Sequence, residues 1–364
     1  MFRKTKLLDL PAVYTAAAFT CDGRWCIGAG SEKKHPAFLL EFGDGRSARI
    51  EKVADGPGGM MSLVPVPGAA RRLVSVMGLF PPFIGREAGV FLHTCSPGGA
   101  WETRPVIALP FAHRCEVVRR QGENHLFVST VSRHKEDPAD WSQPGELHVA
   151  RIPESAEEPW QTRVLKSGLL RHHGMLKTCF DGEELLAVSS AEGIFGFQPE
   201  ATAGDGWKET RLFDREVSEF GFMDLDGDGM DELATIEPFH GNALNIYKRN
   251  AVAVWERRYS SPLAFGHGLS VGRIGGRPVV VVGNRHDSGA LEMHVVRDLS
   301  AGAIECCVVE AQAQPTQTQI FSHQGVDYLL SANQAKNEVA RYRWTGDNSK
   351  TMNSTTLDRH HSSS

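Results

Sequence analysis

Short apolar runs alternate with polar turns along the whole chain, and the periodicity of an amphipathic helix is nearly absent. The runs are bounded by Gly, Pro, Asn and Asp, which favour turns over helices. Pairs of apolar runs around a turn recur seven times, beginning near residues 14, 60, 114, 174, 221, 269 and 318. The pattern therefore predicts seven β-hairpins at intervals of roughly 45 to 60 residues.

Each predicted hairpin is followed by a polar loop and a third apolar run, and a fourth run often opens with tryptophan. The tryptophans at the start of fourth runs are Trp101, Trp160, Trp207 and Trp255. Four antiparallel strands repeated about every 50 residues are typical of a propeller blade. The sequence therefore predicts an all-β fold, a seven-bladed β-propeller, with the tryptophans packed between neighbouring blades.

The two ends of the chain predict how the ring closes. The last blade has no fourth run after residues 338–344, whereas residues 2–12 resemble the fourth runs of the other blades. We expect the N-terminal strand to complete blade seven, which would leave no open sheet edge between the two ends. The predicted organisation is one propeller domain over residues 1–346 and a disordered tail over residues 347–364.

Composition narrows the choice of partners and location. Hydrophobic residues make up 41% of the chain and charged residues 23%, as in globular proteins. The net charge of −5 gives no general attraction to nucleic acid or to anionic membranes. No apolar run approaches the length of a membrane span, and the first twenty residues lack the apolar core of a secretory signal. The expectation is a cytoplasmic monomer that binds neither nucleic acid nor membranes.

The turn "DLDGDGMDE" of the fifth hairpin spaces its oxygen atoms as a calcium loop does. The predicted ligands are Asp224, Asp226, Asp228 and Glu232 at positions 1, 3, 5 and 9, with the backbone carbonyl of Met230 at position 7. Oxygen ligands at alternate positions, with Gly at position 6 for the sharp turn, suit a hard cation. The other six hairpin turns lack this set, so we expect a single calcium ion that stabilises one blade. The alternative is an acidic turn that binds no ion.

Histidines gather by repeat position on the opposite face of the predicted ring. Eight of the fifteen either precede a first strand or lie between second and third strands: His35, His113, His134, His172, His173, His240, His267 and His286. Because first strands begin nearest the axis, we expect His113, His173 and His267 to meet at the mouth of the pore. Three neutral imidazoles could bind zinc or another divalent metal, or act as general acid and base. The alternative is a set of ordinary surface histidines.

The predicted ring of histidines is incomplete. Phe220 and Gln317 take the equivalent positions in blades five and seven, which would leave one side open. The further candidate catalytic residues, from neighbouring loops, are His134, Glu237, His240, Arg285 and His286. Mixed carboxylates and cations around a pit of histidines suit a small polar substrate, either anionic or hydroxylated.

The calcium loop and the blade repeat resemble the FG-GAP/VCBS propeller superfamily over essentially the whole chain. In architecture, the histidine-lined face is similar to two groups of propeller carbohydrate lyases, the aldos-2-ulose dehydratases and the rhamnose–glucuronate lyases. The resemblance implies elimination across a carbon–carbon bond of a sugar, with the help of histidines and a bound metal.

Two function classes follow, and the sequence leaves both open. The first is a lyase or dehydratase acting by β-elimination on a sugar or uronate. In it, His173 or His267 would take a proton, and a metal or Arg285 would hold the enolate charge. The second is a non-catalytic, calcium-stabilised propeller that binds a glycan or a protein partner with the same face. Hydrolysis or epimerisation in the same pit is a third possibility.

Overall fold

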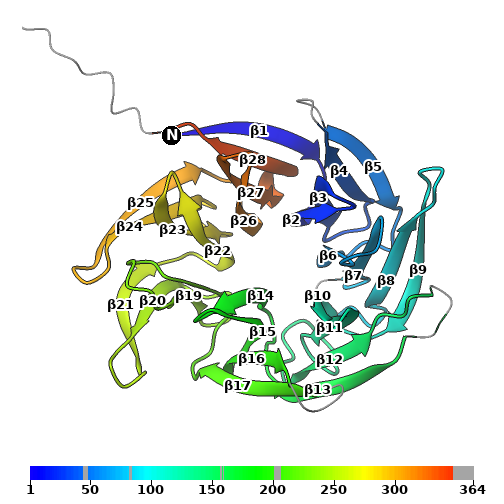
Figure 1. Cartoon of the computed structure of the whole chain (residues 1–364), viewed down its shortest axis with the longest axis horizontal. Helices are drawn as coiled ribbons and strands as arrows, with labels where there is room; N and C mark the ends of the chain where they lie inside the picture. The colour runs from blue at the N-terminus through cyan, green and yellow to red at the C-terminus, as the bar shows by residue number, and fades with distance from the viewer. Residues whose placement is uncertain (44–47, 82–83, 156–157, 159, 201–205, 347–364) are drawn as a thin grey trace, which may run out of the picture.

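The chain folds into seven four-stranded antiparallel sheets arranged around a central axis (Figure 1). This computed structural model describes residues 1–43, 48–81, 84–155, 158, 160–200 and 206–346. The sheets confirm the predicted seven-bladed β-propeller. The predicted tail over residues 347–364 lies outside the described residues.

In blades one to six, four consecutive strands run from the axis to the outer edge. Blade one holds β2 (Val13–Cys21), β3 (Arg24–Ser31), β4 (Ala37–Phe42) and β5 (Ala48–Ala54), and blade two holds β6 (Ser62–Pro65), β7 (Arg72–Met77), β8 (Gly89–Cys95) and β9 (Trp101–Ala108). Blade three holds β10 (Ala112–Arg120), β11 (Glu123–Thr130), β12 (Gly145–Arg151) and β13 (Thr162–Leu169). Blade four holds β14 (Met175–Phe180), β15 (Glu183–Ser190), β16 (Gly193–Pro199) and β17 (Trp207–Phe213).

Blade five holds β18 (Glu219–Met223), β19 (Glu232–Glu237), β20 (Ala243–Arg249) and β21 (Trp255–Pro262). Blade six holds β22 (Gly266–Ile274), β23 (Arg277–Asn284), β24 (Leu291–Asp298) and β25 (Ala303–Glu310). Blade seven takes β26 (Pro315–His323), β27 (Val326–Asn333) and β28 (Glu338–Trp344) from one end of the chain and β1 (Phe2–Asp9) from the other. The helical content of the described part is a single 3-10 turn, η1 (Gln334–Lys336), and no helix there has the length and apolar character to cross a membrane.

Strand β1 closes the ring as predicted. It pairs antiparallel with β28 from Phe2 opposite Trp344 to Asp9 opposite Glu338. The N-terminal ammonium of Met1 also donates to the carbonyl of Gly346 at 2.9 Å. The two ends of the described chain are therefore held together in one sheet.

Tryptophans lie between neighbouring blades, as the repeat predicted. The Trp207 ring of blade four meets the Phe127 ring of blade three edge-on, with centroids 4.7 Å apart. The indole of Trp255 in blade five donates to the carbonyl of Leu212 in blade four at 2.8 Å. These rings fill the widening space between outer strands, so that each blade buries its face against the next.

β-Bulges at the start of four innermost strands change the direction of one or two side chains in each strand. The pairing register shifts at Tyr14 in β2, at His113 in β10 and at Thr316 in β26, and again over His267 and Gly268 in β22. A bulge takes its extra residue out of the regular alternation of the strand and re-aims the side chain. Four blades thus present a bulged residue where the innermost strands begin.

Candidate metal centre

Three histidines from three blades bring one ring nitrogen each to a common point. His173 precedes β14, His240 lies between β19 and β20, and His267 is in β22. The candidate ligand atoms all lie within 4.8 Å of one another, and the Nε2 atoms of His173 and His240 are 3.2 Å apart. An ion about 2.0–2.1 Å from each nitrogen needs only small side-chain shifts to be bound.

Two of these rings are already oriented through their other nitrogen. The Nδ1 of His173 lies 2.8 Å from a carboxylate oxygen of Glu219, and the Nδ1 of His267 lies 2.7 Å from the carbonyl oxygen of Thr316. The Nδ1–H of His267 donates to the Thr316 carbonyl, and the Glu219 carboxylate in contact with the His173 Nδ1 favours a proton on that nitrogen, so both rings favour the tautomer with its lone pair on Nε2. Metal-binding histidines are typically held in this way by a carboxylate or a carbonyl. The residues present therefore fit a divalent transition metal.

His113 lies beside this group rather than in it. Its ring centroid is 4.7 Å from that of His173, and its Nε2 is 3.3 Å from the hydroxyl of Tyr14. The same hydroxyl is 3.2 Å from the Nε2 of His267. The structure thus adds His240 to the expected His173 and His267, and it places His113 next to them through a buried phenol.

Burial determines the protonation states at the centre. Loss of hydration lowers the pKa of His113, His240 and His267 well below the usual value, and the neighbouring histidines lower it further. The pKa of His173 is also lowered by burial, but the Glu219 carboxylate opposes the shift. All four imidazoles are therefore neutral at pH 7, the form that binds metals and accepts protons. Burial raises the pKa of Tyr14, so its hydroxyl stays protonated.

Aromatic side chains surround the outer side of the centre. The Phe239 ring stacks on His240 at 4.0 Å, and the Phe265 ring lies 4.7 Å from both His240 and His286. The guanidinium of Arg285 is 6.0 Å from the Phe265 ring. His173 and His267 are 0% and 1% exposed, whereas His240 is partly exposed. His240 is therefore the member of the trio that reaches toward solvent.

Some of the predicted site residues lie elsewhere. His134 is exposed and bonds to Glu136 at 2.5 Å. The Glu237 carboxylate accepts hydrogen bonds from Thr235 and Tyr247 of its own blade instead of bordering a gap. These side chains contribute no ligand atom to the trio.

The predicted gap in the ring of histidines is also filled differently. Phe220 packs in the core of blades four and five, and the Gln317 side chain accepts a hydrogen bond from Thr15 at 2.7 Å. The bulge in blade seven places Thr316, one residue earlier, at the position equivalent to His113. The sequence reading missed Tyr14, although it occupies the same repeat position in blade one, and it missed the support that Glu219 gives to His173.

The acidic loop of blade five is folded around a lysine. The ammonium of Lys248 on β20 contacts Asp226, lies 2.7 Å from Asp228 and lies 3.1 Å from Glu232. Partial burial alone would lower the pKa of Lys248, but these three carboxylates together raise it above its usual value. The Asp224 carboxylate accepts hydrogen bonds from the backbone of its own loop. Asp224, Asp226 and Glu232 also bring one oxygen each within 4.8 Å of the others, so the carboxylates fit a hard cation.

Comparison with known proteins supports the fold. No family model and no curated protein matches the sequence. Among solved structures, Sqt1 of Saccharomyces cerevisiae is 9% identical, with 91% of this chain and 83% of that chain covered and a TM-score of 0.53. The chain is a seven-bladed β-propeller.

Two further solved structures are less similar in shape. A functionally unknown protein from Desulfotomaculum acetoxidans is 12% identical over 82% of this chain and 89% of that one, with a TM-score of 0.49. A glucose dehydrogenase is 14% identical over 95% and 100%, with a TM-score of 0.48. The resemblance to FG-GAP/VCBS propellers thus rests on the acidic loop and the blade repeat.

Proposed function

We propose that this propeller is a metal-dependent enzyme that carries out β-elimination on a sugar or a uronate, as a carbon–oxygen lyase or dehydratase. The observation that carries the proposal is the convergence of His173, His240 and His267, two of them oriented through Nδ1. An apolar packing role would not require this paired support of buried, neutral imidazoles.

The other residues of the centre take complementary roles. Zinc or another divalent ion held by the trio would act as a Lewis acid on a substrate carbonyl or carboxylate. His113 is neutral and outside the trio, so it can accept the proton on the carbon next to that group. The electron pair of that C–H bond forms the new double bond, while the β carbon–oxygen bond breaks and its oxygen leaves with the proton that His113 has accepted. Arg285 adds positive charge beside the centre, where it would favour the anionic intermediate.

We also propose that the loop of Asp224, Asp226, Asp228, Met230 and Glu232 binds a calcium ion whose role is to stabilise blade five. Calcium would meet the ammonium of Lys248 on the same carboxylates, so the ion and the ammonium would compete. The loop lies in a first-to-second-strand turn, away from the histidines, so removal of calcium should affect stability more than chemistry.

A second candidate function is a non-catalytic, calcium-stabilised propeller that binds a glycan or a protein partner. The observation in its favour is that His113, His173 and His267 are at most 1% exposed. Imidazoles buried to this degree, with or without a metal, could hold the axis of the ring together without touching a substrate.

Metal content and catalysis can be tested separately. Protein purified without chelators should contain one transition-metal ion per chain, and His173→Gln or His240→Gln should lose it. Glu219→Gln should weaken metal binding by about 10- to 100-fold, because it replaces the carboxylate beside the His173 Nδ1 with a neutral amide. His35→Gln, a loop histidine on the same face, should keep the metal and serves as the matched control.

Elimination should then be measured on a panel of uronates and ketosugars by the ultraviolet absorbance of the unsaturated product. His113→Gln should retain the metal and lose most of the elimination. A metal-loaded protein that acts on none of these compounds would favour the non-catalytic function. A protein without transition metal, and with unchanged activity in the His173 variant, would contradict the proposed centre.

A further inference from the structure

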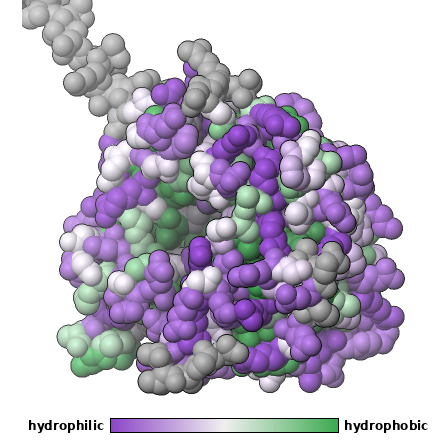
Figure 2. Space-filling model, turned by 45° about the vertical axis from the view of Figure 1, so that its right-hand side comes forward, coloured by the Kyte–Doolittle hydropathy of each residue, from purple (hydrophilic) through white to green (hydrophobic). Residues whose placement is uncertain are grey.

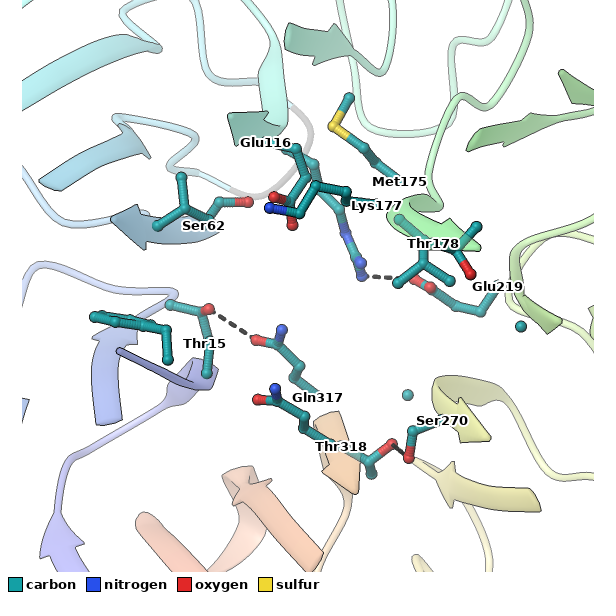
Figure 3. A pocket seen from close by; sticks show the side chains of 18 of the residues that line it. Thr15, Ser62, Glu116, Met175, Lys177, Thr178, Glu219, Ser270, Gln317 and Thr318 are labelled. Carbon is teal, nitrogen blue, oxygen red and sulfur yellow. Dashed lines mark hydrogen bonds and ion pairs between the residues drawn. The ribbon is translucent and has the colours of Figure 1, made fainter. Parts of the chain in front are cut away.

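A cavity of about 530 Å³ runs along the axis, and the paired Arg114 and Glu219 form part of its wall (Figure 3). The innermost strands of the blades line it, over the part that leads to the turns between first and second strands. Labelled polar residues that face it include Ser62, Glu116, Lys177 and Ser270. We call it the axial cavity. None of the described residues that line it is a histidine of the metal centre.

The charges on the wall of the axial cavity balance. Its described lining contains Arg114 and Lys177 as cations and Glu116 and Glu219 as carboxylates. Arg114 and Glu219 are 2.5 Å apart and paired. Burial raises the pKa of the Glu116 carboxyl, and the neighbouring Lys177 ammonium opposes that shift. A wall with two charges of each sign gives no net preference for an anion or a cation.

Neutral hydrogen-bonding groups and apolar side chains make up the rest of the wall. The hydroxyls of Ser270 and Thr318 lie 3.1 Å apart, and the Thr15 hydroxyl donates to Gln317. Apolar surface is contributed by residues such as Met175 (Figure 3). In the space-filling view, the ring surface is hollowed near its middle, with apolar side chains beside polar ones (Figure 2).

This combination matches one class of ligand. An apolar compound would displace water from the polar groups of the wall, such as the Lys177 ammonium, and offer them no hydrogen bonds in return, which costs free energy. An anion bound at Arg114 would have to break the pairing of that guanidinium with Glu219. A compound with many hydroxyls exchanges hydrogen bonds with neutral groups and rests its C–H faces on apolar side chains. The volume lies within the range of about 300–1,000 Å³ that is usual for small-molecule sites.

We propose that the axial cavity is a second binding site, which takes a neutral polyhydroxylated compound, either a small saccharide or a polyol. The site is distinct from the candidate metal centre, because none of its three histidines is among the described residues that line the cavity. It does not depend on the proposed lyase activity.

Maltose, mannitol and glucuronate are suitable probes, measured by ligand-observed NMR against the intact protein. The experiment is done in the His173→Gln background as well as in the wild type, so that a uronate bound at the metal centre does not count. We expect maltose or mannitol to bind both proteins equally. We expect glucuronate to bind the His173→Gln protein about tenfold more weakly than the neutral probes do, or not at all.

Two variants locate the binding. Lys177→Met removes an exposed donor of the cavity and should weaken binding of the neutral probe by about fivefold or more. Lys208→Met, an exposed lysine on the outer strand β17, should leave it unchanged. Ser270→Leu replaces a hydroxyl of the wall with a larger apolar side chain that narrows the cavity, and it should abolish binding, with a melting curve to show that the protein is folded.

The outcomes are distinct from those for the metal centre. Neutral-probe binding that survives in His173→Gln and is lost in Ser270→Leu supports the proposal even if no elimination is ever found. Absence of binding by both neutral probes would overturn it. Tighter binding of glucuronate than of maltose in the His173→Gln protein, or binding unchanged in both cavity variants, would overturn it as well.

Discussion

Buried histidines make the free energy of unfolding of this propeller depend on pH. His93 in β8 is an example away from the candidate metal centre: it is fully buried between Ser75 and Thr103, and burial lowers its pKa to about 4. The folded protein therefore keeps this ring neutral at a pH where the unfolded chain, with a pKa of about 6.5, is protonated. A base with a lowered pKa in the folded state contributes its full stability above the unfolded pKa and loses it as the pH falls.

The first prediction concerns this loss. Between pH 6 and pH 4, each such histidine should lower the free energy of unfolding by about 1.4 kcal/mol per pH unit. The slope should be steeper than one histidine gives, because the axial imidazoles are buried too. Urea unfolding at several pH values measures it, and His93→Gln should reduce the slope by about one histidine's share. A stability that is constant from pH 7 to pH 4 would contradict the neutral, buried state of these rings.

At the same scale, the sequence predicted part of the centre. His173 and His267 could be placed together because repeat position alone puts them where first strands begin, and His240 was expected nearby. Tyr14 was missed because nothing in its residue type marks it as a partner of histidine. The exact reach of each side chain depends on bulges, and a bulge in β26 moves Thr316 instead of Gln317 into the ring.

The acidic loop between β18 and β19 was predicted to bind calcium, and the structure adds a lysine that contacts the same carboxylates. The spacing of Asp224, Asp226, Asp228 and Glu232 predicted calcium, but the part played by Lys248 comes from a neighbouring strand. Strand pairing in the blade determines that contact, because β20 lies beside β19. A sequence motif contains only consecutive residues, so it cannot show a side chain that a neighbouring strand places next to it.

The second prediction follows from the proposed competition between calcium and the Lys248 ammonium for the same carboxylates. Chelation by EGTA should lower the melting temperature of the wild type by at least about 2 °C, the shift that about 1 kcal/mol gives in a large domain. Lys248→Met removes the internal cation and leaves the carboxylates to repel one another. It should therefore bind calcium more tightly than the wild type and lose more stability in EGTA. Calorimetric titration with calcium and thermal melting provide the two measurements.

Arg273→Met is a useful control for the loss of a nearby cation, since Arg273 donates to the backbone carbonyl of Asp224 in the loop. Its calcium affinity should stay close to that of the wild type. If EGTA changes the melting temperature of neither the wild type nor Lys248→Met, then the loop holds the lysine and no ion.

For the whole molecule, closure of the ring is the feature that the sequence predicted most directly. Strands and turns were readable because alternating apolar residues and turn residues act locally, and the missing fourth strand of blade seven matched the unpaired strand at the N-terminus. The axial cavity was not predicted, since its volume depends on how seven blades meet and not on any one of them.

The third prediction is that removal of residues 1–10 lowers the melting temperature by roughly 5 °C or more. The deletion exposes the paired edge of β28 and the apolar contacts of Leu7, Leu8 and Leu10. A chain shortened after residue 346 is the matched control and should melt like the wild type. Equal melting temperatures for the wild type and the N-terminal deletion would show that β1 does not hold the ring closed.

The pairing of β1 with β28 also brings the first residue of the chain next to the end of β28 in one sheet. Thr345 donates to the carbonyl of Met1 at 3.0 Å, so the first residue and the end of β28 are neighbours. A short linker across this point, with a new break in any turn between two blades, would give a permuted chain whose strands keep every partner. In such a molecule, blade seven would be continuous and another blade would be assembled from two ends. Which blade is numbered first therefore depends on where the chain starts, and the arrangement of the seven blades does not.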